Sequence, residues 1–194
     1  FVFLLLSFEA LQTFRSSKDL VEEDTDAKYQ LRLNEAIKLY EEKDLDLAIE
    51  NFVSLRRDLN SGKIYLVASV FLAKIYSTQK EWIAAFEVLK SVELLLDYEG
   101  LVLYQEVLFT LKHYEKSLAF GRKSFRMSPH ADIAIINAYS AAQLGQVTEA
   151  VGWLKYLSSF SEVNFKSILN HETLNNIRSE PSFLRFLNES FHNK

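Results

Sequence analysis

Small residues recur along the chain at positions that share one helical environment. Ala48, Ala85, Ser117 and Ala150 follow one another at spacings of 37, 32 and 33 residues. The residue four positions after each of them lies on the same side of the helix, so it can pack against the same neighbouring helix. A small side chain at such a place lets two helix backbones approach closely. The pattern therefore predicts four close helix crossings.

The best-defined example runs from His113 to Pro129. Ser117, Gly121 and Ser124 are spaced by four and three residues, which places them on one face of a helix. Pro129 ends this helix, because proline lacks the backbone N–H and disfavours the helical conformation at the residue before it. The stretch is thus expected to be a helix whose small face packs against a neighbour.

Each small residue opens the second helix of a predicted helical hairpin, here called helix B, and a first helix, helix A, precedes it. The predicted turns between the two helices are Lys43-Asp44, Gln79-Lys80, Lys112-His113 and Leu144–Gln146. One hairpin cannot bury both of its faces, so hairpins of this kind stack on one another. Two prolines and five glycines also fit helices better than a chain of many tight turns.

The period of about 34 residues and the small-residue pattern resemble the tetratricopeptide (TPR) repeat. The resemblance implies an all-α fold, a right-handed α-solenoid of about four TPR-like helical hairpins plus short C-terminal capping helices. The sequence also departs from the family pattern. Trp–Leu–Gly is absent from the start of every helix A, Gln105 replaces a small residue, and only the third repeat ends in proline. Another α-solenoid or a plain helical bundle is the alternative.

The tail loses the repeat period after Leu157. Residues 170–183 resemble the segment that closes the last repeat of some bacterial TPR proteins, where a short helix is followed by proline and phenylalanine. The apolar residues expected to cover the open end are Leu174, Ile177, Phe183, Phe186 and Leu187. An exposed last repeat needs such a cover. We therefore assign residues 28–160 to the repeats and 161–194 to a C-terminal cap.

The N-terminal residues 1–14 are strongly apolar. They are too few to cross a bilayer, which takes about 20 residues. Two interpretations remain. The segment is either the end of a membrane helix that begins upstream of Phe1, or an amphipathic helix docked on protein, with the surface near Ile37, Tyr40 and Val70 as one place for it. Residues 15–27 are polar and acidic, and we interpret them as a solvated linker in which Asp24, Thr25 or Asp26 caps the next helix.

No pattern of residues in the chain predicts catalysis or cofactor binding. The glycines are isolated, so there is no phosphate-binding loop, and there is no cysteine. His171-Glu172 begins a zinc-protease motif, but Asn175 stands where the second histidine is needed. A net charge of −4 argues against binding to nucleic acid. We predict a protein that is not an enzyme and has no catalytic, cofactor-binding or metal-binding residues.

The remaining functional surface is the concave face that a TPR array lines with helix A residues. The residues predicted to form a partner-binding groove are Leu33, Ile37, Tyr40, Val70, Lys74, Glu106, Phe109, Ile135 and Tyr139. Such a groove suits an apolar or amphipathic peptide segment, and predicts a protein-interaction scaffold. The alternative is a soluble regulatory appendage of a membrane protein, such as a rhomboid-like intramembrane protease. A cytoplasmic or membrane-associated location is expected in either case.

Overall fold

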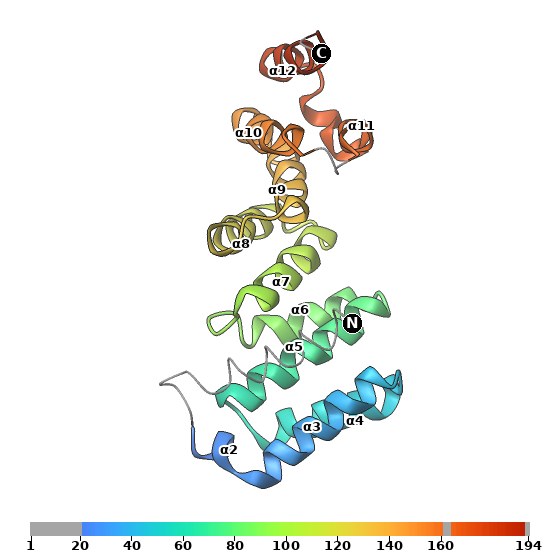
Figure 1. Ribbon diagram of the computed structural model, residues 1–194, viewed down its shortest axis with the longest axis vertical. Coiled ribbons are helices and arrows are strands. Elements are labelled where there is room, and N and C mark those ends of the chain that lie inside the picture. The colour runs from blue at the N-terminus through green and yellow to red at the C-terminus, as the bar shows by residue number, and fades with distance from the viewer. Residues whose placement is uncertain (1–20, 161–163, 193–194) are drawn as a thin grey trace. The chain divides into compact units, whose positions relative to one another are not determined.

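The computed structural model describes residues 21–160 and 164–192, and every regular element within these ranges is a helix (Figure 1). The chain divides after Leu95 into two compact units, which we call unit 1 and unit 2 and describe separately. Residues 1–14, for which two interpretations were given above, lie outside the described residues. No described helix is both long enough and apolar enough to be a membrane-spanning segment.

Unit 1 contains a short helix followed by two helical hairpins. Its helices are α2 (Glu22–Thr25), α3 (Ala27–Glu41), α4 (Leu45–Asp58), α5 (Gly62–Thr78) and α6 (Trp82–Lys90). Helix α3 packs on α4, and α5 packs on both α4 and α6. These pairs are the first two predicted hairpins, with α3 and α5 as helices A.

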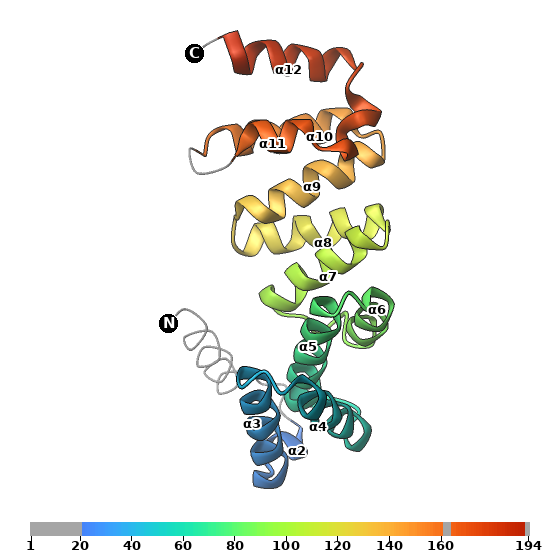
Figure 2. The same cartoon turned by 90° about the vertical axis from the view of Figure 1, so that its right-hand side faces the viewer.

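Unit 2 contains the other two hairpins and the C-terminal tail (Figure 2). Its elements are α7 (Tyr98–Thr110), α8 (Tyr114–Met127), α9 (Ala131–Gln143), α10 (Val147–Ser158), α11 (Phe165–Asn170), the 3-10 helix η1 (Glu172–Ile177) and α12 (Pro181–His192). Helix α7 packs on α8, and α9 packs on both α8 and α10. The all-α arrangement of TPR-like hairpins followed by short capping helices is confirmed.

The four small residues that open helix B are all completely buried, as the repeat pattern predicts. The turn before each of them holds one residue with a left-handed backbone, at a φ of 62° to 69°. These turn residues are Lys43, Lys80, Lys112 and Gly145. Each lies five positions before the small residue of its own hairpin, so the turn and the helix crossing keep a fixed separation in all four repeats.

The long first spacing of 37 residues comes from one helix. Helix α5 has 17 residues, whereas α7 and α9 have 13 each. The four additional residues correspond to about one turn at 3.6 residues per turn. The turns and loops around α5 are no longer than in the fourth repeat. A longer loop around residues 60–62 therefore does not contribute to the 37-residue spacing.

The crossing between α7 and α8 explains why Gln105 can replace a small residue. Gln105 is fully buried, and its amide lies against Gly121, where a Cβ atom would come within 2.3 Å of the Gln105 nitrogen. The same nitrogen donates a hydrogen bond to Asn137 Oδ1 at 3.0 Å. Ser117 Oγ donates to the backbone carbonyl of Gln105. The large polar side chain on helix A is thus accommodated because helix B has a glycine opposite it.

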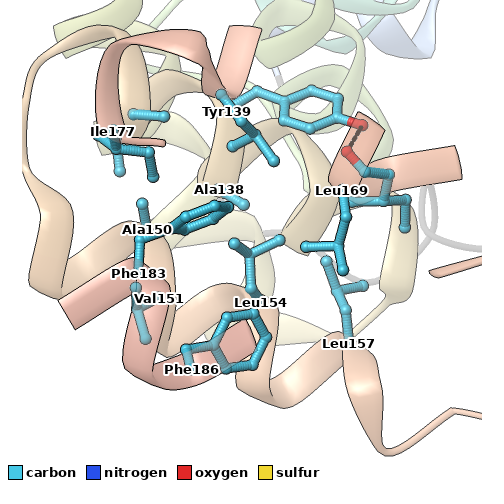
Figure 3. Close-up of a cluster of buried hydrophobic side chains, with 14 of the residues drawn as sticks. Ala138, Tyr139, Ala150, Val151, Leu154, Leu157, Leu169, Ile177, Phe183 and Phe186 are labelled. Atoms are coloured by element: carbon cyan, nitrogen blue, oxygen red, sulfur yellow. Dashed lines mark hydrogen bonds between the residues drawn. The ribbon is translucent and has the colours of Figure 1, made fainter. Parts of the chain in front are cut away.

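The tail forms the predicted cap. Leu174, Ile177, Phe183 and Phe186 are buried with the apolar residues of α9 and α10 in one core, and Leu187 is half-buried at its edge. Figure 3 shows Phe183 and Phe186 directed toward Ala150 and Leu154 of α10. Pro181 is the first residue of α12, where its missing N–H has no cost.

The acidic segment before α3 differs from the solvated linker expected, because it contains the short helix α2 and a buried carboxylate. Asp24 is 1% exposed, and its carboxylate accepts hydrogen bonds from the backbone N–H groups of Lys63 at 2.9 Å and Ile64 at 2.8 Å. It therefore caps α5, about 40 residues away, rather than α3. Asp26 caps α3 through the N–H of Lys28. The unpaired N–H groups at the start of a helix attract a carboxylate, which explains the burial of Asp24.

Candidate functional site

In unit 1, the structure brings two of the predicted groove residues onto one aromatic group. Tyr40 on α3 meets Phe71 on α5 edge to face, with ring centroids 5.2 Å apart, and Lys74 Nζ lies 5.2 Å from the centre of the Phe71 ring. Tyr40, Lys74 and the neighbouring Ile37 are all half-buried. We call Ile37, Tyr40, Phe71 and Lys74 the helix A face of unit 1.

The other two predicted residues of unit 1 are not available to a partner. Leu33 is 2% and Val70 is 8% exposed. Helix α3 packs against both α4 and α5, so apolar side chains in the middle of this packing are enclosed by their neighbours. Both residues belong to the core, because a helix that packs on two others buries more than one stripe of its surface.

Phe71 and Lys43 contribute to this face although the sequence analysis did not select them. The Phe71 ring links the core to the surface, since it stacks on buried Phe52 at 5.5 Å and also meets Tyr40. Lys43 Nζ lies 5.6 Å from the centre of the Tyr40 ring. The sequence analysis assigned no role to Phe71 and took Lys43 only as a turn residue. Two lysines next to two rings add a cationic character that the sequence alone did not indicate.

In unit 2, the predicted residues lie on α7 and α9. Phe109 is half-buried and its ring lies 5.7 Å from that of Tyr114 and 6.2 Å from that of Tyr139. Ile135 is half-buried at the edge of the C-terminal core. Glu106 stays exposed, although partial desolvation by the surrounding protein raises the pKa of its carboxyl group.

Tyr139 is covered by the tail instead of facing an open groove. It is 7% exposed, its ring stacks on that of His171 at 4.4 Å, and its hydroxyl donates to the carbonyl of Ile168 at 3.3 Å (Figure 3). One turn further along α9, Gln143 donates to the carbonyl of Thr173 at 2.7 Å. Burial raises the pKa of Tyr139 to about 12, so the phenol remains protonated and can donate at neutral pH.

Titratable groups in the described ranges do not form a metal-binding cluster. No group of three or more His, Asp or Glu side chains in residues 21–160 and 164–192 is placed to hold a metal ion. His171 interacts with Thr173 in its own turn, and Glu172 is exposed. The arrangement on these helix surfaces is one of aromatic and cationic side chains, a combination that can bind another chain.

Comparison with known proteins supports the repeat architecture. No protein-family model and no curated protein matches the sequence. Among solved structures, one that is similar is YrrB, described as a TPR protein with an unusual peptide-binding site. The two structures superpose with a TM-score of 0.68 at 12% sequence identity, over 83% of this chain and 84% of that chain. Together with the four hairpins and their recurring crossings, this similarity shows that the chain has the TPR fold.

Proposed function

We propose that the protein is a non-catalytic interaction scaffold that binds a peptide segment of a protein partner on the helix A face of unit 1. The observation that carries the proposal is the half-buried ring of Tyr40, which packs edge to face on the buried ring of Phe71, with the half-buried Lys74 on the other helix beside it. Aromatic rings next to long cationic side chains are typical of protein interfaces, where they supply large contact areas. The peptide-binding site of YrrB, a protein of the same fold, supports the same kind of function.

The chemistry of the face indicates what the peptide presents. Ile37 and Tyr40 favour apolar side chains, and Lys43 and Lys74 favour a carboxylate close to them. An amphipathic segment with apolar residues on one side and an acidic residue beside them matches both features. On α9, the tail covers Tyr139, and for that reason we place the primary contact in unit 1. Glu106, Phe109 and Ile135 form a secondary candidate surface in unit 2.

Selection of random peptides displayed on phage tests the proposal. We expect the full chain to enrich sequences with apolar residues three or four positions apart and at least one Asp or Glu. Tyr40→Ala is expected to weaken binding of the selected peptides at least about tenfold, the loss typical of an aromatic contact at the centre of an interface. Lys74→Glu should discriminate against the acidic peptides without removing an apolar contact.

The matched control is Ile83→Ala, which truncates a 72% exposed apolar side chain on α6, outside the helix A face. It should bind the selected peptides like the unmodified protein. Circular dichroism of each variant confirms that the helices are retained. The proposal is wrong if folded Tyr40→Ala and Lys74→Glu bind the selected peptides as tightly as the Ile83→Ala control does.

A further inference from the structure

A row of aromatic side chains lies where α8 meets α10, on the helix B side of unit 2. The ring of Phe125 meets those of Trp153 at 4.8 Å and Tyr156 at 5.0 Å, both edge to face, and Tyr156 meets Phe160 at 4.9 Å. Phe160 is 39% exposed, and the other three are half-buried. We call these four residues the α8–α10 seam. The rings of Phe125, Trp153 and Tyr156 pack against the C-terminal core and remain partly exposed.

Glu149, a carboxylate beside these rings, is already engaged. Glu149 forms a two-point ion pair with Arg122, whose Nε lies 2.7 Å from Oε1, and Trp153 Nε1 donates to the same oxygen at 3.3 Å. The hydrogen bond from Arg122 lowers the pKa of Glu149, so the carboxylate is ionised at neutral pH and its charge is compensated. The pair therefore neither attracts cations nor repels anions from the seam.

The exposed side of α8 next to the seam is basic. Lys123 and Arg126 are exposed on α8, whose acidic residue, Glu115, lies in its first turn. Arg126 is one helical turn beyond Arg122, which places it beside the ion pair and close to Phe125. The whole chain carries a net charge of −4, so this local excess of positive charge runs against the balance of the protein.

Gly152 lies on the exposed surface of α10, one turn before Tyr156. A Cβ atom built at this position meets nothing within 4 Å, in contrast to Gly121, where it would collide with two side chains. Glycine in the middle of a helix is less favourable than alanine, and at position 152 no intramolecular contact requires it. A helix surface without a side chain lets another backbone approach closely.

We propose that the α8–α10 seam, with Gly152 and the basic side of α8, is a second docking surface and that its occupant is an acidic amphipathic helix of another protein. Apolar side chains of that helix would cover Phe160 and Tyr156, its backbone would approach at Gly152, and its carboxylates would pair with Lys123 and Arg126. The charge complementarity selects an acidic partner. This surface is formed by helices B and is distinct from the helix A face of unit 1.

The test uses the full chain with Trp82→Phe, which leaves Trp153 as the single tryptophan and as a reporter within the seam. The probe is a designed peptide of about 16 residues, long enough to form a helix, with Leu on one face, Glu on the other and no aromatic residue. We expect saturable binding that shifts Trp153 emission to shorter wavelength. The same peptide with Gln in place of Glu should bind at least about tenfold more weakly at low salt.

Two variants locate the contact. Lys123→Glu combined with Arg126→Glu removes the charge complementarity, and Gly152→Leu places a side chain where a backbone is expected to approach, in space that is open in the free protein. Each is expected to weaken binding about tenfold or more. Lys166→Glu, which makes the same kind of charge change at an exposed position of α11, should leave binding unchanged.

Three results would overturn the proposal. One is equal binding of the Glu and Gln peptides, and another is unchanged binding by folded Gly152→Leu and by the double charge reversal. The third is concentration-dependent self-association in sedimentation that Gly152→Leu abolishes, since the seam would then be covered by a second copy of the chain. None of these results affects the Tyr40 test, so the two proposals fail independently.

Discussion

The two units differ in where a buried carboxylate or amide side chain lies. In unit 1, Ala36, Ala48, Ala73 and Ala85 are completely buried at the helix crossings, and the buried carboxylate, Asp24, lies in the short helix that precedes the hairpins. In unit 2, a buried amide pair, Gln105 on α7 and Asn137 on α9, lies against Gly121 of α8, and the C-terminal end is closed by phenylalanines. Helical hairpins of the same kind thus accommodate a buried polar side chain either at a helix N-terminus or between packed helices.

This difference shows what each location demands. Asp24 satisfies backbone donors that any helix start exposes, so it needs only one carboxylate in the right place. A buried amide inside a crossing needs a glycine opposite it and a second amide as partner, because an unpaired buried polar group costs about 1–3 kcal/mol. The amide pair is not fully satisfied, because Gln105 Oε1 and Asn137 Nδ2 have no hydrogen-bond partner among the described residues. A buried amide between packed helices therefore requires more specific neighbours than a carboxylate at a helix N-terminus does.

The largest effect is expected at the apolar end of unit 2. Phe183→Ala removes a completely buried ring from the cap and should lower the free energy of unfolding by about 3–5 kcal/mol. Urea denaturation followed by circular dichroism measures it. Leu184→Ala, at a neighbouring position that is 47% exposed, serves as the control and should change little. Equal stability of the two variants would mean that the end of unit 2 is not closed by this core.

Alanine should have opposite effects on stability at two helical glycines, one against the buried amides and one on an open helix surface. Gly121→Ala places a Cβ atom 2.0 Å from Asn137 Oδ1 and should destabilise the protein by about 1–3 kcal/mol through overpacking. Gly152→Ala meets open space and should stabilise it by about 0.8–1 kcal/mol, the difference in helix propensity. Urea denaturation of both variants is the measurement. If Gly121→Ala were also stabilising, the amides would not be held against α8.

At the polar end of unit 1, Asp24→Ala should lower stability by about 0.5–2 kcal/mol, the usual range for loss of a helix cap. Asp24→Asn should lower the free energy of unfolding by less than Asp24→Ala does. Some loss remains, because both carboxylate oxygens accept hydrogen bonds and an amide retains only one acceptor oxygen. Hydrogen exchange of the Lys63 and Ile64 amides would locate the effect. Unchanged exchange in Asp24→Ala would show that these amides do not depend on Asp24.

The smallest effect concerns the Arg122–Glu149 pair. Glu149→Gln should cost about 0.2–1 kcal/mol at neutral pH, as expected for a pair that is partly exposed. The folded-state pKa of Glu149 is lowered, so its contribution is present above the unfolded value of about 4.3 and is lost as the pH falls through the folded value. Urea denaturation at pH 7 and pH 3 should give a difference between the two proteins only at pH 7.

Most of the fold could be predicted from the repeat period of the sequence. The residues at 48, 85, 117 and 150 could be placed because a close crossing excludes large side chains, and such a local steric rule is visible in one sequence. The pairing of Asp24 with α5 could not be placed in the same way. It joins positions about 40 residues apart, and nothing in the acidic segment indicates which helix end it meets.

The candidate site was predicted less completely, for a related reason. Periodicity identifies which side of a helix A faces away from helix B, and Tyr40 and Lys74 do share such a face. It does not show how many neighbours cover that side. Leu33 and Val70 are enclosed because α3 packs on two helices, and Tyr139 is enclosed because the tail returns over α9. Both coverings depend on tertiary packing and could not be read from the local sequence.

The additional turn of α5 has a consequence for how such chains can change in length. Four residues rotate a helix by about 400°, so an insertion of this size returns the packing face to within about 40° of its original direction. One or two inserted residues would instead turn that face by about 100° or 200°, away from its neighbours. Length variation in a helix A is therefore expected in steps of three or four residues. In this protein, the longer helix also provides the N-terminus to which Asp24 attaches the preceding segment.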